Sequence, residues 1–343
     1  MIAVLFGALS AVFFGAGDFV GGFASRRVTA MLVTGLAALA GVIALTIAAP
    51  FDGGVWHAET WAGGVGTGIT SCLGIWLLYS AYSVGPMTTL APAVAIVSTL
   101  VPMAAGLLTG ETFSSLGWAS VAIGLIAIAL VAAAPDSRAS KARPIDMVKA
   151  SVAGAFLGLF YIYLDGGFGN VYVDEAGLTP IMANRITCVV IAFLVVALLA
   201  ARGRRILVDE RLTQTKPPLR FTVGTSSRGP AVVEPTNALP AATATLTRER
   251  PTASAANRSK VKRIVLASAV GLAMLSGTFD ATANALFTVG LGFGDLAVLS
   301  VVSGFYPAVT IGLAFLILRE RPNRLQTVGI VLSLIALVGI SLA

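Results

Sequence analysis

Four formally charged side chains fall inside long apolar stretches of this sequence: Asp18, Asp165, Arg185 and Asp280. A charged side chain at bilayer depth costs at least about 2.5–3.5 kcal/mol, so it is expected to pair with an opposite charge or to face water. Asp165, Arg185 and Asp280 are predicted at similar depth on three different helices, and Asp18 is predicted nearer the opposite side of the membrane. An arginine and carboxylates in one water-filled pocket could bind a charged solute and exchange protons with it. A purely structural ion pair is the alternative.

Three uncharged side chains extend this set of candidates. Asn284 follows Asp280 by one helical turn, so the two share a helix face and the amide lengthens the polar wall. Tyr161 and Tyr306 are candidates for lining a solute path, with packing as the alternative role.

Three prolines lie in the interior of apolar runs, Pro92, Pro102 and Pro307, and the last two are the predicted kinks. An interior proline frees the carbonyl four residues back, here that of Ser98 or Ser303, and kinks the helix. At membrane depth a freed carbonyl is tolerated only beside protein or water, an arrangement typical of transporters. A plain structural kink remains the alternative.

The residues of common catalytic and metal sites are nearly absent. The only histidine, His57, is predicted in a loop, and both cysteines, Cys72 and Cys188, lie within apolar runs. The glycine-rich run 63–68 has no lysine and no preceding soluble strand, so it does not match a phosphate-binding loop. We therefore predict no enzyme activity, no metal and no cofactor.

Composition and run lengths predict an all-α polytopic membrane protein. Hydrophobic residues make up 57% of the chain and charged residues 11%, against roughly 25% charged in soluble domains. A helix needs about 20 apolar residues to cross the hydrocarbon core. Ten such spans are predicted: Ile2–Ala24, Ala30–Ala49, Trp61–Ser83, Thr88–Thr109, Leu116–Ala134, Val148–Leu164, Leu178–Ala201, Ile264–Gly290, Leu296–Leu318 and Leu325–Leu342.

The charges outside these spans divide by side of the membrane. Every lysine and arginine except Arg185 falls on one side, which we call the basic side, and the loops of the other, acidic side carry only acids. The positive-inside rule then places the basic side in the cytoplasm and both termini outside. The basic excess is explained by topology in a cell membrane, so no nucleic-acid partner is predicted.

The two halves of the chain share one plan. Aligning Leu77 with Leu286 also aligns Glu111 with Glu320 and Leu116 with Leu325, and an internal repeat of this kind sets the architecture of a transporter. We predict two five-helix repeats, residues 1–134 and 148–343, joined by a short basic connector at 135–147. Residues 202–263 contain six prolines without apolar periodicity and are predicted to form a disordered cytoplasmic loop. A tolerated insertion and a lipid-touching segment are both open roles for that loop.

Several motifs resemble the drug/metabolite transporter superfamily, in its form with two EamA-type repeats. They are residues 15–27 (GAGDFVGGFASRR), 158–160 (GLF), 164–165 (LD), 183–185 (ANR), 280–284 (DATAN), 306–310 (YPAVT), 319–321 (RER) and 325–329 (LQTVG). The resemblance implies ten helices in two inverted five-helix repeats around a central cavity, and movement of small metabolites or drugs by alternating access. The long central loop departs from the family pattern. The predicted outside termini also depart from it, because family members often keep their termini in the cytoplasm.

Together these observations predict a secondary transporter of a small organic solute, acting as an exporter. Asp18, Asp165 or Asp280 would couple transport to protons, and Arg185 would hold an acid or an anionic group of the substrate. The expected partners are that small molecule and membrane lipid, with the oligomeric state open. Two other classes remain as alternatives: a membrane-embedded enzyme or accessory protein acting on lipids, and a passive channel.

Overall fold

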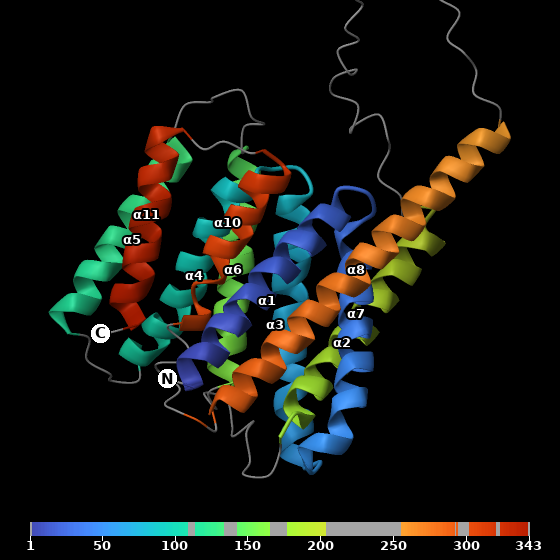
Figure 1. Ribbon diagram of the computed structural model, residues 1–343, viewed down its shortest axis with the longest axis horizontal. Helices are drawn as coiled ribbons and strands as arrows, with labels where there is room; N and C mark the ends of the chain where they lie inside the picture. The colour runs from blue at the N-terminus through green and yellow to red at the C-terminus, as the bar shows by residue number, and fades with distance from the viewer. Residues whose placement is uncertain are drawn as a thin grey trace, which may run out of the picture. The chain divides into compact units, whose positions relative to one another are not determined.

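The computed structural model describes residues 2–108, 114–133, 143–164, 177–203, 255–291, 293, 302–319 and 323–341. Within them the chain forms ten helices and no strand (Figure 1). The helices are α1 (Ile2–Ser25), α2 (Ala30–Asp52), α3 (Ala58–Tyr82), α4 (Met87–Leu108), α5 (Ser115–Ala133), α6 (Pro144–Leu164), α7 (Thr179–Ala201), α8 (Ala255–Leu291), α10 (Tyr306–Ile317) and α11 (Arg324–Ser341). Five of them, α1, α2, α3, α7 and α8, contain segments of 22–25 residues that are long and apolar enough to cross a membrane. The predicted all-α polytopic fold is confirmed.

The structure differs from the prediction at the start of α8. The predicted loop 202–263 was expected to end before a span beginning at Ile264, but α8 begins at Ala255. The segment from Ala255 to Arg263 contains no proline and is built from alanine, lysine and arginine with few poor helix formers, so it can extend the helix. The prediction of a disordered loop over residues 204–254 lies outside the described residues.

The two predicted proline kinks also have different outcomes. Pro307 lies in the first turn of α10, where the amide nitrogen of Ala308 bonds to the carbonyl of Phe305 at 2.9 Å. A helix therefore starts at Tyr306, so Pro307 does not bend a continuous one. This position suits proline because the first helical turn leaves its N–H groups unpaired in any case. Pro102 belongs to α4, which runs through it from Met87 to Leu108.

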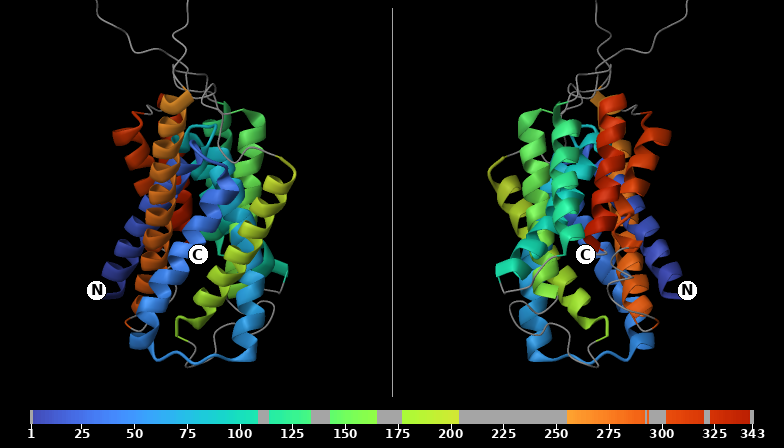
Figure 2. Two further views of the ribbon diagram at one scale, coloured as in Figure 1. Left: turned by 90° about the vertical axis from the view of Figure 1, so that its right-hand side faces the viewer. Right: turned by 90° about the vertical axis from the view of Figure 1, so that its left-hand side faces the viewer.

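Helix contacts pair the two halves of the chain. Helix α3 packs against α6 and α7, and α4 packs against α6 (Figures 1 and 2). The corresponding contacts in the other half are those of α8 with α1 and α2, and of α10 with α1. The remaining large contacts, α2 with α7, α4 with α10 and α5 with α11, each join a helix to its own counterpart. This is the pattern of two repeats related by a two-fold axis.

Two of these contacts depend on glycine. A Cβ atom at Gly277 of α8 would overlap the backbone carbonyl of Ala37 in α2, and one at Gly154 of α6 would lie 2.6 Å from the carbonyl oxygen of Val94 in α4. Small residues let helix backbones approach this closely in a membrane, where packing and not the hydrophobic effect holds helices together.

Charges within the described residues follow the predicted sides. Arg26, Arg143 and Arg202 lie at the helix ends that face one side, together with Arg27, Arg319 and Arg324, and Lys149 lies in the second turn of α6. At this basic side the exposed Arg143 binds the buried carboxylate of Asp146 through its Nε at 3.0 Å, which raises the pKa of the Arg143 guanidinium. Helix α1 begins and α11 ends at the opposite, acidic side (Figure 1).

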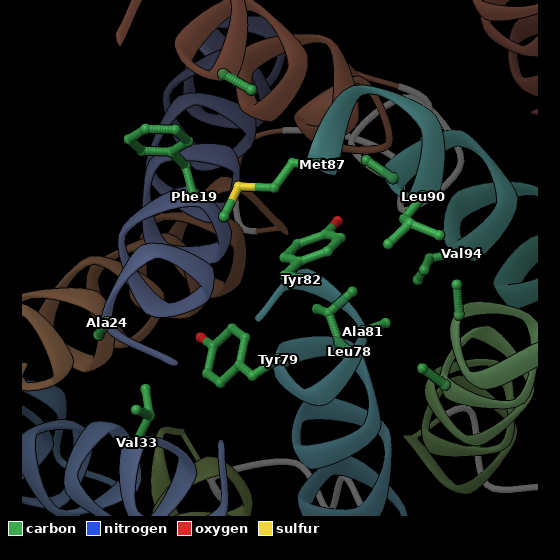
Figure 3. Packing of buried hydrophobic residues seen from close by; sticks show 14 of the residues in the cluster. Phe19, Ala24, Val33, Leu78, Tyr79, Ala81, Tyr82, Met87, Leu90 and Val94 are labelled. Atoms are coloured by element: carbon green, nitrogen blue, oxygen red, sulfur yellow. The ribbon is translucent and has the colours of Figure 1, made fainter. Parts of the chain in front are cut away.

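The largest buried apolar cluster also lies toward the basic side. It gathers the end of α1, the beginning of α2, the end of α3 and the beginnings of α4 and α6, with Tyr82, Met87, Leu90 and Val94 among its fully buried side chains (Figure 3). A smaller cluster toward the acidic side contains Leu45, Leu178, Ile181 and Ala281. Among the described residues, apolar packing is therefore more extensive at the basic side.

Candidate functional site

An ion pair joins α7 to α8. The Nη2 atom of Arg185 contacts the Oδ2 atom of Asp280, and Arg185 is only 7% exposed. The aliphatic part of Arg185 runs past Gly41 of α2, where a Cβ atom would lie 3.2 Å from Cδ. The Nε atom of Arg185 is buried without a hydrogen-bond partner among the described residues. On one edge of the guanidinium, Nη2 is thus engaged by Asp280, whereas Nε has no acceptor among the described residues.

Asn284 supports the carboxylate from the next turn of α8. Its Nδ2 atom donates to the backbone carbonyl of Asp280 at 2.8 Å and lies 3.5 Å from Oδ2 of the same residue. The Asn284 amide therefore lies on the same helix face as Asp280. It sits beside the carboxylate oxygen that contacts Arg185.

Asp18 joins the same site from α1. Its neighbour Gly17 packs on α8, where a Cβ atom would lie 3.5 Å from the amide nitrogen of Asp280, so the carboxylates of Asp18 and Asp280 lie close enough to repel each other. The sequence prediction had placed Asp18 apart from Asp280, nearer the basic side. Helix α1 packs on α8 so that the Gly17 carbonyl accepts from Ser276 at 2.8 Å, one turn before Asp280. That register brings Asp18 to the depth of Asp280.

The remaining predicted site residues are placed only in part. Asp165 lies outside the described residues, and Tyr161 belongs to α6, but nothing about its side chain is described. Tyr306 opens α10, and its ring meets that of Phe14 in α1 edge to face at 6.4 Å. Tyr306 therefore has a packing contact with α1, which leaves its predicted role in lining a path open.

Two further polar pairs lie at the site, and their serines were not predicted. Tyr79 of α3 bonds to Ser276 of α8 at 2.9 Å, and Asn184 of α7 donates to the buried Ser71 of α3 at 3.0 Å. Serine is common in membrane helices, where its hydroxyl bonds to its own helix, so the residue type alone gives no signal. The adjacency of Asn184 to Arg185 was the one available indication.

The two cysteines are buried where α3 meets α7. The Cys72 thiol donates to the carbonyl of Cys188 at 3.8 Å, within a cluster that includes Met31, Ala38 and Ala192. No group of three potential metal ligands occurs in the part of the chain that the structure describes. The polar chemistry of the described site is therefore that of one guanidinium, two carboxylates, an amide and hydroxyl groups.

Comparison with known proteins matches this arrangement to one family. The family model described as "EamA-like transporter family" matches residues 1–133 and 245–342. These residues include Asp18 and Asp280, whereas Arg185 falls between the two matched segments. No curated protein matches the chain. A solved structure described as "Crystal structure of protein" is similar over 99% of this chain and 96% of its own, at 14% identity and a TM-score of 0.47.

Proposed function

Since this chain belongs to the EamA-like transporter family, we propose that it is a proton-coupled secondary transporter of a small organic metabolite or drug. The solute crosses the cell membrane by alternating access. Export is the proposed direction. The family membership and the ten described helices already make the chain a multi-pass membrane transporter, and the proposal concerns what it carries and how transport is driven.

The observation that carries the proposal is the buried Arg185–Asp280 pair with Asp18 beside it. The three side chains come from α7, α8 and α1, so both halves of the chain contribute to one charged site. In a transporter built from inverted repeats, the solute site lies near mid-membrane between the repeats, and the repeats rock about it. A charged cluster that joins the two halves at depth fits that position.

Arg185 is the proposed anchor for an acidic group of the solute. Its Nε–H has no acceptor among the described residues, and Nε and Nη2 lie on one edge of the guanidinium. A carboxylate or phosphate binds such an edge through two parallel hydrogen bonds. The solute would then share or replace the contact that Asp280 makes with Nη2.

Asp18 and Asp280 are the proposed coupling groups. One arginine can neutralise one carboxylate, and the second carboxylate remains as an uncompensated charge within the same site. A bound proton removes that charge, and an anionic solute that takes the arginine leaves both acids to be neutralised in this way. Solute binding and proton binding are then linked through Arg185.

The test begins with a growth-protection screen. Cells that overexpress the chain are challenged with amino acids, nucleosides and toxic compounds, and the protective hit is then followed in proteoliposomes under an imposed pH gradient. Asp280→Asn should keep the fold, because the amide is nearly isosteric, and should lose gradient-driven uptake. Thr278→Val is the control, because Thr278 lies two residues earlier on α8 and its hydroxyl bonds only to Met274 of the same helix at 3.0 Å. Normal rate and normal pH dependence in both Asp280→Asn and Asp18→Asn would contradict coupling at this site.

A further inference from the structure

Two consecutive hydrogen bonds through hydroxyl groups connect α3, α8 and α1. The Ser276 hydroxyl donates to the Gly17 carbonyl at 2.8 Å, and the Tyr79 hydroxyl lies 2.9 Å from Ser276 Oγ. A serine hydroxyl has a single proton. Because Ser276 gives that proton to Gly17, Tyr79 must be the donor to Ser276. The direction of both bonds is therefore fixed, and both are buried.

The ring of Tyr79 packs directly against Gly21 of α1. A Cβ atom at Gly21 would overlap the Cζ and hydroxyl oxygen of Tyr79 and would lie 2.7 Å from Ser276 Oγ. The Ser25 hydroxyl lies 2.9 Å from the carbonyl oxygen of Tyr79 and 2.7 Å from that of Gly22, so the two carbonyls share its one proton. Both ends of Tyr79 therefore contact the last turns of α1.

Tyr79 stands between the charged site and the basic side. It is 4% exposed and belongs to the large apolar cluster there, where Figure 3 shows it next to Tyr82 and facing α1. It also lies within electrostatic reach of Asp18, Asp280 and Arg185. Its hydroxyl meets α1 at Gly21, about one turn beyond Asp18, so it lies on the basic side of those charges.

The positions that correspond to Tyr79 and Ser276 in the opposite repeats carry other residues. The alignment that pairs Leu77 with Leu286 pairs Tyr79 with Thr288 and Ser276 with Thr67. Thr67 bonds within its own helix, to the carbonyls of Gly63 at 3.0 Å and Gly64 at 3.1 Å. Thr67, which corresponds to Ser276, therefore bonds only within α3 among the described residues. Ser276, in contrast, links α8 to both α3 and α1.

We propose that Tyr79, Ser276 and Gly21 form a latch that holds the basic side closed and must open in each transport cycle. Tyr79 and Ser276 act as positioning residues, because they set the balance between the two access states without binding the solute. Because the latch has no matching counterpart at Thr67, the resting protein favours the state that is closed at the basic side. This proposal rests on alternating access, and its test measures access directly and needs no substrate.

The experiment measures thiol labelling in purified protein in lipid nanodiscs, with Cys72 and Cys188 replaced by alanine. Two matched reporters are made separately. Met87→Cys lies in the buried cluster at the basic side, and Met182→Cys lies against the cluster at the acidic side. Adding Tyr79→Phe should speed N-ethylmaleimide labelling at position 87 by roughly two- to twelvefold, the ratio expected for loss of one hydrogen bond. Labelling at position 182 should slow or stay unchanged.

Ser276→Ala and Gly21→Ala provide independent versions of the same test, because the first removes the middle of the chain and the second displaces the ring. Ser98→Ala is the control: Ser98 is also a buried serine, but its hydroxyl bonds to Ala95 of its own helix at 2.9 Å. Labelling that rises at both reporters indicates general loosening and overturns the latch. Unchanged labelling in Tyr79→Phe, or an equal effect of Ser98→Ala and Ser276→Ala, overturns it as well. None of these outcomes depends on which solute is carried, so a failed latch leaves the proposed transport function standing.

Discussion

At the scale of single residues, Arg185 has the largest expected effect on stability. It is nearly fully buried, its Nη2 engages Asp280, and Asp18 adds a second carboxylate nearby. Truncating one partner of a buried pair leaves the other charge without compensation, which costs far more than the intact pair contributes.

We therefore expect Arg185→Ala to lower the free energy of unfolding by about 3–5 kcal/mol. Thermal unfolding in detergent would measure this as a lower Tm. Arg185→Ala combined with Asp280→Asn should recover most of the lost stability but not transport, because the uncompensated charge is gone and the anion anchor is still missing. The exposed Arg324 supplies the control variant, Arg324→Ala, with an expected change within about 0.5 kcal/mol. A double variant as unstable as Arg185→Ala alone would show that Asp280 is not the charge that Arg185 compensates.

At the scale of helices, close approach at glycines positions the site. Gly277 is one residue after Ser276, and its contact with Ala37 holds α8 against α2, the helix that also accommodates Arg185 at Gly41. The register of α8 against α2 therefore helps to set where Asp280 meets Arg185.

Two glycines of α8 give a matched test of this point. Gly277→Ala places a methyl group into the Ala37 backbone, so we expect a loss of about 1–3 kcal/mol of stability, as for other overpacked sites. Gly271→Ala meets nothing within 4 Å and should be neutral or gain up to about 1 kcal/mol from helix propensity. Thermal unfolding, or unfolding by SDS, compares the stabilities of the two variants. Equal effects of the two substitutions would mean that α8 and α2 can separate at no cost.

Sequence patterns predicted the helices and part of the site, and the reasons for the misses are physical. Apolar run length identifies a membrane helix, and the cost of burying a charge singled out Arg185 and Asp280, which the structure does bring together. Depth counted along a single helix could not place Asp18, because the stagger of α1 against α8 is set by packing at Gly17 and Ser276. The interruption before Pro307, where helical residues 302–303 are followed by a turn and a new helix begins at Tyr306, leaves no signal in hydropathy.

At the scale of the whole molecule, the distribution of charge gives a prediction of topology. Arg26, Arg27, Arg143, Arg202 and Arg324 lie at the helix ends of one side, while α1 begins and α11 ends at the other. The positive-inside rule then places both termini outside the cell.

Single-cysteine labelling in whole cells tests this directly, on a background without Cys72 and Cys188. A cysteine at position 343 should react with a membrane-impermeant maleimide in intact cells. A cysteine at position 141, in the basic connector, should react only after the membrane is permeabilised. The reverse pattern would place the basic side outside and both termini in the cytoplasm.

The distance along the chain between Arg185 and Asp280 also has a consequence for biosynthesis. The arginine is made first, and at typical synthesis rates the aspartate follows about 5–20 s later. Of the two carboxylates that surround Arg185 in the finished site, only that of Asp18 exists during this interval. During this interval Arg185 is a costly charge at membrane depth without its later partner. We therefore expect α7 to become fully stable in the bilayer only after α8 is inserted and supplies Asp280.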